Sequence, residues 1–69
     1  MLARTVEIVV RGRLGSPLVA ALDGYRIEPV ADGTTRVTGP VLDQPMLLGL
    51  LEMFDDLNIE VVSVNRVAS

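Results

Sequence analysis

The segment from Asp43 to Val64, DQPMLLGLLEMFDDLNIEVVSV, constrains the fold most, because it predicts a helix that runs directly into a strand. Asp43 or Gln44 is placed to cap this helix, and Pro45 suits its first turn. Apolar residues then recur at helical spacing, namely Leu47, Leu50, Leu51, Phe54 and Leu57. β-Branched residues dominate from Ile59 to Val67, which is typical of a strand. A one-sided helix beside a strand indicates a layered domain with both element types.

The first half of the chain predicts the same kinds of element. Residues 5–13 alternate in polarity, which indicates a strand whose buried face carries Val6, Ile8 and Val10. Ser16 is expected to cap a helix of about two turns, with Pro17 at its first position and Gly24 as its stop.

Residues 25–39 predict a hairpin. Apolar and charged residues alternate on both sides of Asp32-Gly33, a pair that accepts the positive φ of a tight turn. Pro29 has no N–H to donate to a neighbouring strand, so its strand is expected at a sheet edge.

These elements follow the order β-α-β-β-α-β over a single domain, residues 1–69. We therefore predict an α+β, ferredoxin-like sandwich, with an antiparallel sheet of strand order 4-1-3-2 and both helices on one face.

The composition indicates self-association. A chain of 69 residues buries only about 60% of its unfolded surface, and without Cys or His it has no disulfides and few metal ligands to supplement its core. Hydrophobic residues nevertheless make up 49% of the chain. We expect a homodimer through the open sheet face, with its apolar centre at Val9, Val30, Val62 and Val64. Neither face of the last strand is polar, so the sequence leaves open which of the two is buried.

The charge distribution argues against nucleic acid as a partner. The net charge is −3, and all six basic residues are arginines spread along the chain with one Tyr and one Phe, rather than a basic face with stacking aromatics. No apolar run reaches the ~20 residues that a membrane span needs, and no signal-peptide pattern is present. The expected location is cytoplasmic.

Two resemblances rest on the Asp43–Val64 segment. It resembles the ligand-facing half of ACT domains, small regulatory modules, with Asp43, Pro45, Leu47, Leu48, Asn58 and Ile59 at comparable places and Met46 where that family usually has Gly. The whole chain is also similar to small, uncharacterised bacterial proteins that carry a G-P-x-x-D-Q-x-x-L-x-G-L-L segment, here residues 39–51. The ACT resemblance implies binding of an amino acid or a similar small polar ligand between protomers.

Asp43 and Gln44 are thus candidate ligand contacts, since N–H groups at a helix start and the Gln44 amide suit a carboxylate. Capping alone accounts equally for both residues. Gly49 lies inside the same predicted helix, where Gly is unfavourable, and predicts close approach of another backbone.

The segment VRGRLGSP, residues 10–17, is the second candidate site. Its backbone N–H groups and guanidinium groups suit a phosphate or carboxylate, and the residues concerned are Arg11, Gly12, Arg13, Gly15 and Ser16. The alternative is a loop shaped by its glycines with solvated arginines.

Catalysis has few candidate groups, because the chain lacks His, Cys and Lys. We name no catalytic residue, metal ligand or cofactor. The favoured interpretation is a non-catalytic, homo-oligomeric binding or regulatory module for a small anionic ligand or a protein partner. The alternative is a small dimeric enzyme that uses carboxylates in a sheet cavity.

Overall fold

The computed structural model of the chain describes residues 4–67. Its elements are β1 (Arg4–Arg11), α1 (Ser16–Ala21), β2 (Arg26–Val30), a 3-10 turn (Ala31–Gly33), β3 (Thr34–Val41), α2 (Gln44–Asp56) and β4 (Val61–Arg66). The expected order of strands and helices is therefore confirmed. The prediction of one domain extends to residues 1–3 and 68–69, which lie outside the described residues.

The four strands form one antiparallel sheet in the order β2-β3-β1-β4. Read from the other edge, the same order is β4-β1-β3-β2. Strand β2, which contains Pro29, lies at an edge as expected, where a missing N–H is tolerated.

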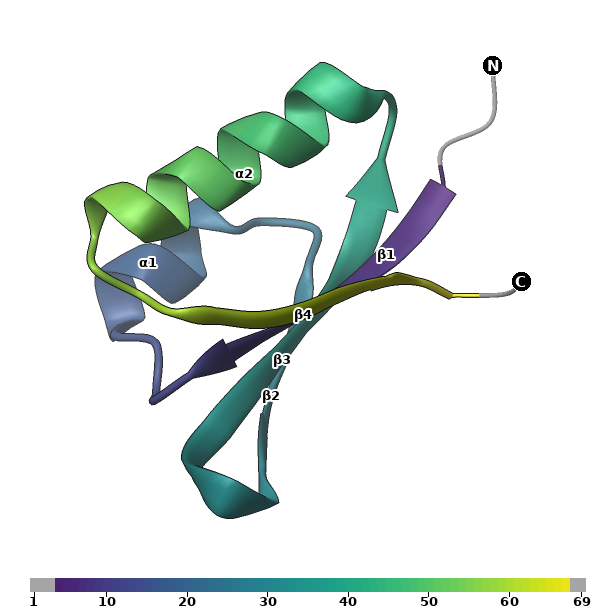
Figure 1. The fold of residues 1–69 in the computed structure, drawn as a ribbon. Coiled ribbons are helices and arrows are strands. Elements are labelled where there is room, and N and C mark those ends of the chain that lie inside the picture. The colour runs from purple at the N-terminus through teal and green to yellow at the C-terminus, as the bar shows by residue number, and fades with distance from the viewer. Residues whose placement is uncertain (1–3, 68–69) are drawn as a thin grey trace.

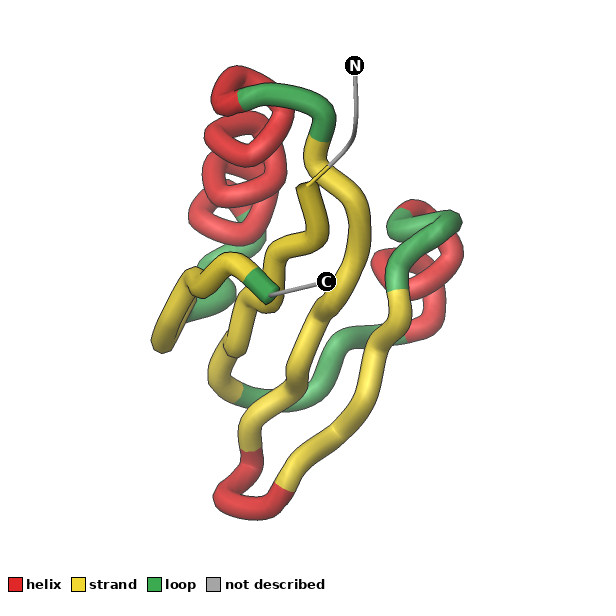
Figure 2. Tube along the Cα trace, turned by 90° about the vertical axis from the view of Figure 1, so that its right-hand side faces the viewer, coloured by secondary structure: helices red, strands yellow, loops and turns green. Residues whose placement is uncertain are grey.

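Both helices lie on the same side of the sheet (Figure 1). Figure 2 shows α2 toward the β4 side of the sheet and α1 toward the β2 side. No element within residues 4–67 covers the opposite sheet face, so we call the two sides the helix face and the open face.

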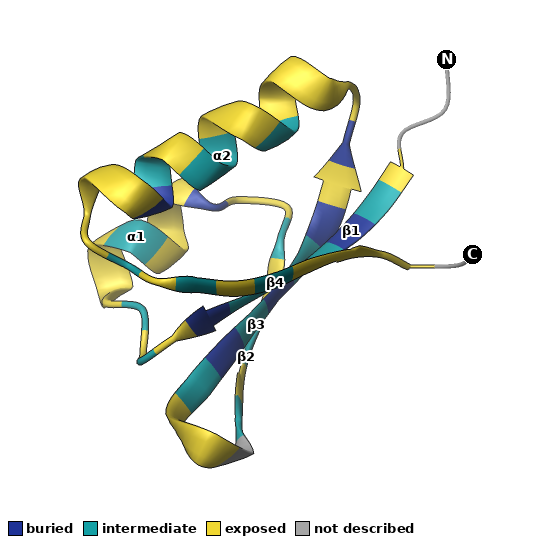
Figure 3. Ribbon diagram, viewed as in Figure 1, coloured by how far each residue is buried: buried dark blue, intermediate teal, exposed yellow. Residues whose placement is uncertain are grey.

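The core lies between the helix face and α2 (Figure 3). Alternate residues of β1 point into it, which confirms the expected buried set of Val6, Ile8 and Val10. Phe54 of α2 is fully buried against them. Helix α1 contributes no buried residue of its own, although Leu22, directly after it, is buried.

The cross-strand contact of Tyr25 with Gly39 fixes the β2 side of the core. The Tyr25 ring lies directly over Gly39, so that a Cβ at this position would overlap the ring. The phenol donates a hydrogen bond to the Pro40 carbonyl at 2.6 Å. Burial raises the pKa of Tyr25 above its usual 10.0 because the charged phenolate is poorly solvated there.

Local sequence signals were partly right. Asp32 and Gly33 both have positive φ, as the hairpin turn requires. Asp43 is the N-cap of α2, and its carboxylate accepts a hydrogen bond from the Met46 N–H at 3.0 Å. The prediction that Ser16 caps α1 was wrong. The N-cap of this helix is Gly15, and no side chain caps it.

The prediction for Gly49 was also wrong. Within residues 4–67, no atom apart from the chain neighbours of Gly49 and the nearby backbone of its own helix lies within 4 Å of a Cβ built at this position, and the residue is exposed. No neighbouring backbone therefore requires a glycine here.

The predicted interface residues do not share one face. Val9 lies opposite Arg36 and Val30 opposite Thr34 on the open face, where most neighbours are polar. Val64 lies opposite Ile8 and therefore on the helix face. The reason is a register shift near Val62 that leaves this residue without a β1 partner and changes the phase of the strand.

Within residues 4–67, no helix combines the length and apolar character needed to cross a membrane.

Candidate functional site

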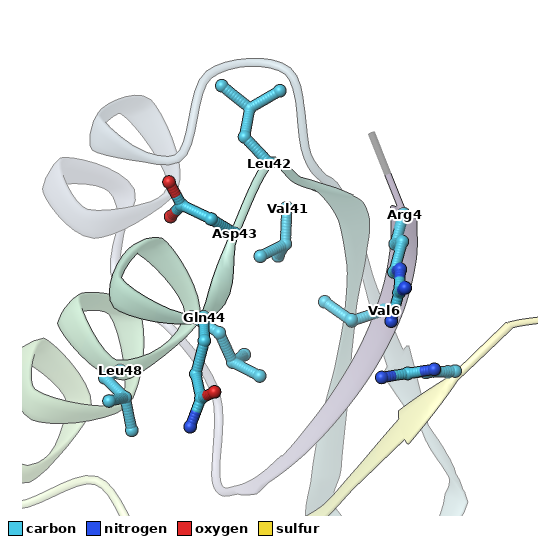
Figure 4. A pocket seen from close by; sticks show the side chains of 9 residues that line it. Arg4, Val6, Val41, Leu42, Asp43, Gln44 and Leu48 are labelled. Atoms are coloured by element: carbon cyan, nitrogen blue, oxygen red, sulfur yellow. The ribbon is translucent and has the colours of Figure 1, made fainter. Parts of the chain in front are cut away.

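A pocket of about 630 Å³ opens at the end of the sheet where β1 begins and β3 and β4 end. The first turn of α2 forms its opposite wall (Figure 4). We call it the two-arginine pocket, and its lining residues are Arg4, Val6, Val41, Leu42, Asp43, Gln44, Leu47, Leu48 and Arg66.

Strand register brings the two arginines together. Arg66 of β4 lies directly opposite Val6 of β1, and Arg4 lies two residues before Val6 on the same face. Arg4 and Arg66 are thus diagonal neighbours on the helix face, a separation that long side chains span easily. They are 62 positions apart in the chain, and the β1–β4 pairing alone makes them neighbours.

Both arginines are exposed, and neither forms an ion pair within the described part of the chain. The ion pairs in that part join Arg11 to Glu60 and Arg36 to Glu7. Two guanidinium groups without a carboxylate partner repel each other, and an anion between them would remove that repulsion.

The floor of the pocket is apolar. Val6 and Val41 are buried at 5% exposure each, and Leu47 is partly buried against the core. Leu48, on the side of α2 that lines the pocket, is 48% exposed. The pocket therefore presents positive charge at one side and aliphatic surface at the other.

Gln44 and Asp43 line the α2 side in different ways. Figure 4 shows the Gln44 amide extending toward the β1 side of the pocket, whereas the Asp43 carboxylate turns away from Arg4. That carboxylate is engaged in the cap, where it accepts from the Met46 N–H. Asp43 thus has the capping role, and Gln44 offers a free-standing donor and acceptor.

The second candidate segment lies at the other end of β1, so the structure does not bring the two candidate sites together. Its backbone is occupied within the chain. The Gly12 N–H donates to the Gly33 carbonyl at 2.7 Å, and the Gly12 carbonyl accepts from the Thr35 hydroxyl at 2.5 Å. Gly12 has a φ of 90°, which explains why a glycine stands there.

Some side chains of this segment are also engaged in contacts within the chain. Arg11 pairs with Glu60 across the β1–β4 edge at 3.2 Å. Gly15 and Ser16 begin α1, a helix of six residues, and the Gly15 carbonyl accepts from the N–H groups of Leu18 and Val19. Anion binding by this loop stays a prediction, and two of its donors, the Gly12 N–H and the Arg11 Nε, are already engaged within the chain.

Arg13 stands apart from the others. It lines a smaller hollow of about 240 Å³ with mostly apolar neighbours between the loop and the hairpin, which are Leu14, Val19, Ile27, Pro29 and Thr35. A single arginine over an apolar hollow offers fewer polar contacts than the two-arginine pocket.

Sequence reasoning missed Arg4 and Arg66 as site residues. A signal was present in β1, because Arg4 shares the phase of the buried set Val6, Ile8 and Val10 and so continues the core face as a charge. Arg66 gave no such signal. Its face depends on the register shift near Val62, which the valine-rich sequence of β4 does not reveal.

Comparisons with known proteins assign no activity. No curated protein and no solved structure matches the chain. One family model matches residues 5–65, a span that includes all four strands and both helices except the first residue of β1 and the last of β4. The chain belongs to the family described as a domain of unknown function, DUF8691.

Proposed function

We propose that this domain is a non-catalytic binding or regulatory module that holds a small carboxylate with an aliphatic body, such as an aliphatic amino acid, in the two-arginine pocket. The observation that carries the proposal is the position of Arg4 and Arg66, which line an apolar-floored pocket without an acidic partner among the described residues.

The chemistry of the pocket favours a carboxylate over other anions. Guanidinium groups bind carboxylates through paired N–H donors, and such charge-assisted hydrogen bonds are stronger than neutral ones. Phosphate shares this chemistry, but Val6, Val41 and Leu47 offer it no hydrogen bonds. An aliphatic body attached to the carboxylate would cover these side chains and remove apolar surface from water.

The acidic side chain at the two-arginine pocket favours binding over catalysis. Among the described residues that line the pocket, Asp43 alone has a carboxylic side chain, and it is engaged in capping α2. A general base must reach the proton that it removes, and this carboxylate turns the other way. The element order and the helices on one face support assignment to the ferredoxin-like fold, in which ACT domains form one regulatory family.

The first experiment measures binding of 4-methylpentanoate, an acid with an aliphatic body, by isothermal calorimetry. Replacing Arg66 by Gln removes one guanidinium and is expected to weaken binding about tenfold or more, since a charged hydrogen bond contributes roughly 1.5–3 kcal/mol. The matched control is Arg26→Gln, an exposed arginine of edge strand β2 on the open face, which is expected to leave the affinity unchanged.

Equal loss in both variants would mean that overall charge alone attracts the acid. No saturable binding to the wild-type chain at millimolar acid would remove the proposal.

A second titration with L-leucine examines the amino group. The Gln44 side-chain oxygen is the group placed to accept from an ammonium, so Gln44→Ala should weaken leucine binding more than it weakens binding of 4-methylpentanoate. An equal effect on both compounds would assign the pocket to simple carboxylic acids.

A further inference from the structure

The two edges of the sheet differ in how they are protected. In an antiparallel sheet, alternate residues of each strand direct their N–H and C=O groups to one neighbour and the rest to the other side. The Thr5 carbonyl accepts from the Val67 N–H at 2.9 Å, and the Arg11 N–H donates to the Glu60 carbonyl at 2.9 Å. Odd-numbered residues of β1 therefore face β4, and even-numbered residues face β3.

The same alternation shows that the β2 edge is closed to another strand. Even-numbered β1 residues pair with odd-numbered β3 residues, so even-numbered β3 residues such as Arg36 face β2. Their partners, including Glu28, face inward, which leaves Pro29 facing outward. Pro29 presents no N–H at this edge, and such a gap is a common protection against strand addition.

The β4 edge has no such protection along its second half. Ser63 and Asn65 pair with odd-numbered β1 residues and face inward. Val64 and Arg66 therefore direct their N–H and C=O groups away from the sheet. The register shift at Val62 disturbs only the beginning of the strand, and no Pro or Lys follows it.

Exposed apolar side chains lie beside this edge. Val62 is 47% exposed and Val64 is 38% exposed, and Leu48 of α2, which lines the adjoining pocket with Arg66, is similarly exposed. An unpaired strand with exposed apolar side chains is the kind of edge to which another strand adds.

We propose that a second copy of this chain pairs its β4 with β4 of the first across a twofold axis, joining the two sheets into one of eight strands. The occupant follows from self-complementarity, because a twofold axis makes β4 antiparallel to its own copy. With an axis at Val64, the Val64 N–H of each copy would donate to the Val64 C=O of the other. The same axis sets Arg66 of each copy opposite Val62 of the other, so the two Arg66 side chains stay apart. The two-arginine pocket of each copy then lies on its own side of the interface.

This interface differs from the open sheet face that the sequence suggested. The open face carries Val9 and Val30 among charged and polar neighbours, including Glu7, Arg36 and Glu28. A sheet face presents side chains, whereas unpaired backbone N–H and C=O groups lie at the sheet edges. The proposal is independent of the pocket and its ligand.

The test is the mass of the purified chain by analytical ultracentrifugation at micromolar concentration. The wild-type chain is expected to be a dimer, and Val64→Lys a monomer, because lysines would face each other at the axis. Val9→Lys, a matched change on the open face, is expected to remain a dimer. A wild-type monomer up to millimolar concentration would overturn the proposal, and so would dissociation by Val9→Lys with Val64→Lys still dimeric.

Amide hydrogen exchange on the wild-type chain keeps the test valid if Val64→Lys does not fold. The Val64 and Arg66 amides point away from β1 and should exchange fast in a monomer but slowly in a dimer. Above the dissociation constant, their protection is expected to rise about threefold for each tenfold rise in protein concentration, because the monomer fraction of a dimer falls as the square root of the total concentration. Fast exchange at both amides at all concentrations, with Ser63 and Asn65 protected, would rule out pairing at this edge.

Discussion

Two arginines lie near each end of β1, close to the start of a helix, yet the two ends differ in how their polar groups are used. At the end that leads to α1, Arg11 is paired with Glu60, and both backbone polar groups of Gly12 are hydrogen-bonded. At the other end, Arg4 and Arg66 line a pocket without an ion-pair partner in residues 4–67. We call these the closed end and the pocket end.

Closeness of polar residues in the sequence therefore does not imply that their donors are free to bind a ligand. The closed end looks like a site because its glycines and arginines are close together in the sequence, but contacts within the chain use two of its donors, the Arg11 Nε and the Gly12 N–H. The pocket end has no contiguous motif, and its unpaired charges come from opposite ends of the chain. Unpartnered groups mark a candidate site better than a local pattern does.

The largest expected effect on stability lies at the closed end. Thr35 is 2% exposed, and its hydroxyl donates to the Gly12 carbonyl. Thr35→Val leaves that carbonyl without its donor and should lower the free energy of unfolding by about 1–3 kcal/mol. Urea denaturation measures the change. Thr38→Val, on the open face of the same strand, is the matched control and should have a small effect, and equal losses in both variants would contradict a special role for the Gly12 contact.

The second effect concerns the cap at the pocket end. Asp43→Ala removes the acceptor of the Met46 N–H and should cost about 1 kcal/mol in unfolding free energy. Asp43→Asn preserves an acceptor and should recover most of this loss. If Asp43→Ala unfolds at the same urea concentration as the wild type, the cap does not stabilise α2.

Strand β1, the hairpin turn and the edge position of β2 could be predicted from the sequence because their signals are local. Alternating polarity located β1, the Asp32-Gly33 pair located the hairpin turn, and Pro29 indicated an edge strand. Each signal depends on a few neighbouring residues and on steric rules that hold in any fold.

The pocket required information that the sequence does not carry locally. Arg4 and Arg66 meet only after β1 and β4 pair, and the face of Arg66 depends on the extra residue at Val62. A one-residue shift moves every later side chain of a strand to the other face, so Val64 was assigned to the wrong surface for the same reason. Gly49 shows the opposite failure, since its occurrence in a helix suggested a contact that does not exist.

The third effect is a gain in stability at the middle of α2. Gly49 has a helical position with open space around it, so Gly49→Ala should raise the free energy of unfolding by up to ~1 kcal/mol. Binding of 4-methylpentanoate at the pocket end should not change, because Gly49 does not line the pocket. A loss of stability would show that another chain approaches this glycine.

The smallest effect is expected for the ion pair at the closed end. Arg11 and Glu60 are 60% and 66% exposed in their side chains, and exposed pairs contribute less than about 1 kcal/mol. Arg11→Gln should therefore change the urea midpoint little and leave 4-methylpentanoate binding intact. A tenfold loss of affinity in this variant would reverse the comparison between the two ends.

The most direct test of the account is to observe the arginine side chains themselves. In a ¹⁵N-labelled chain, the Nε–H resonances report each guanidinium separately as 4-methylpentanoate is added at constant ionic strength. Binding in the two-arginine pocket predicts saturable shifts at Arg4 and Arg66 with one shared dissociation constant, and small, linear shifts at Arg11 and Arg13. Saturable shifts at Arg11 or Arg13, with Arg4 and Arg66 unchanged, would contradict it.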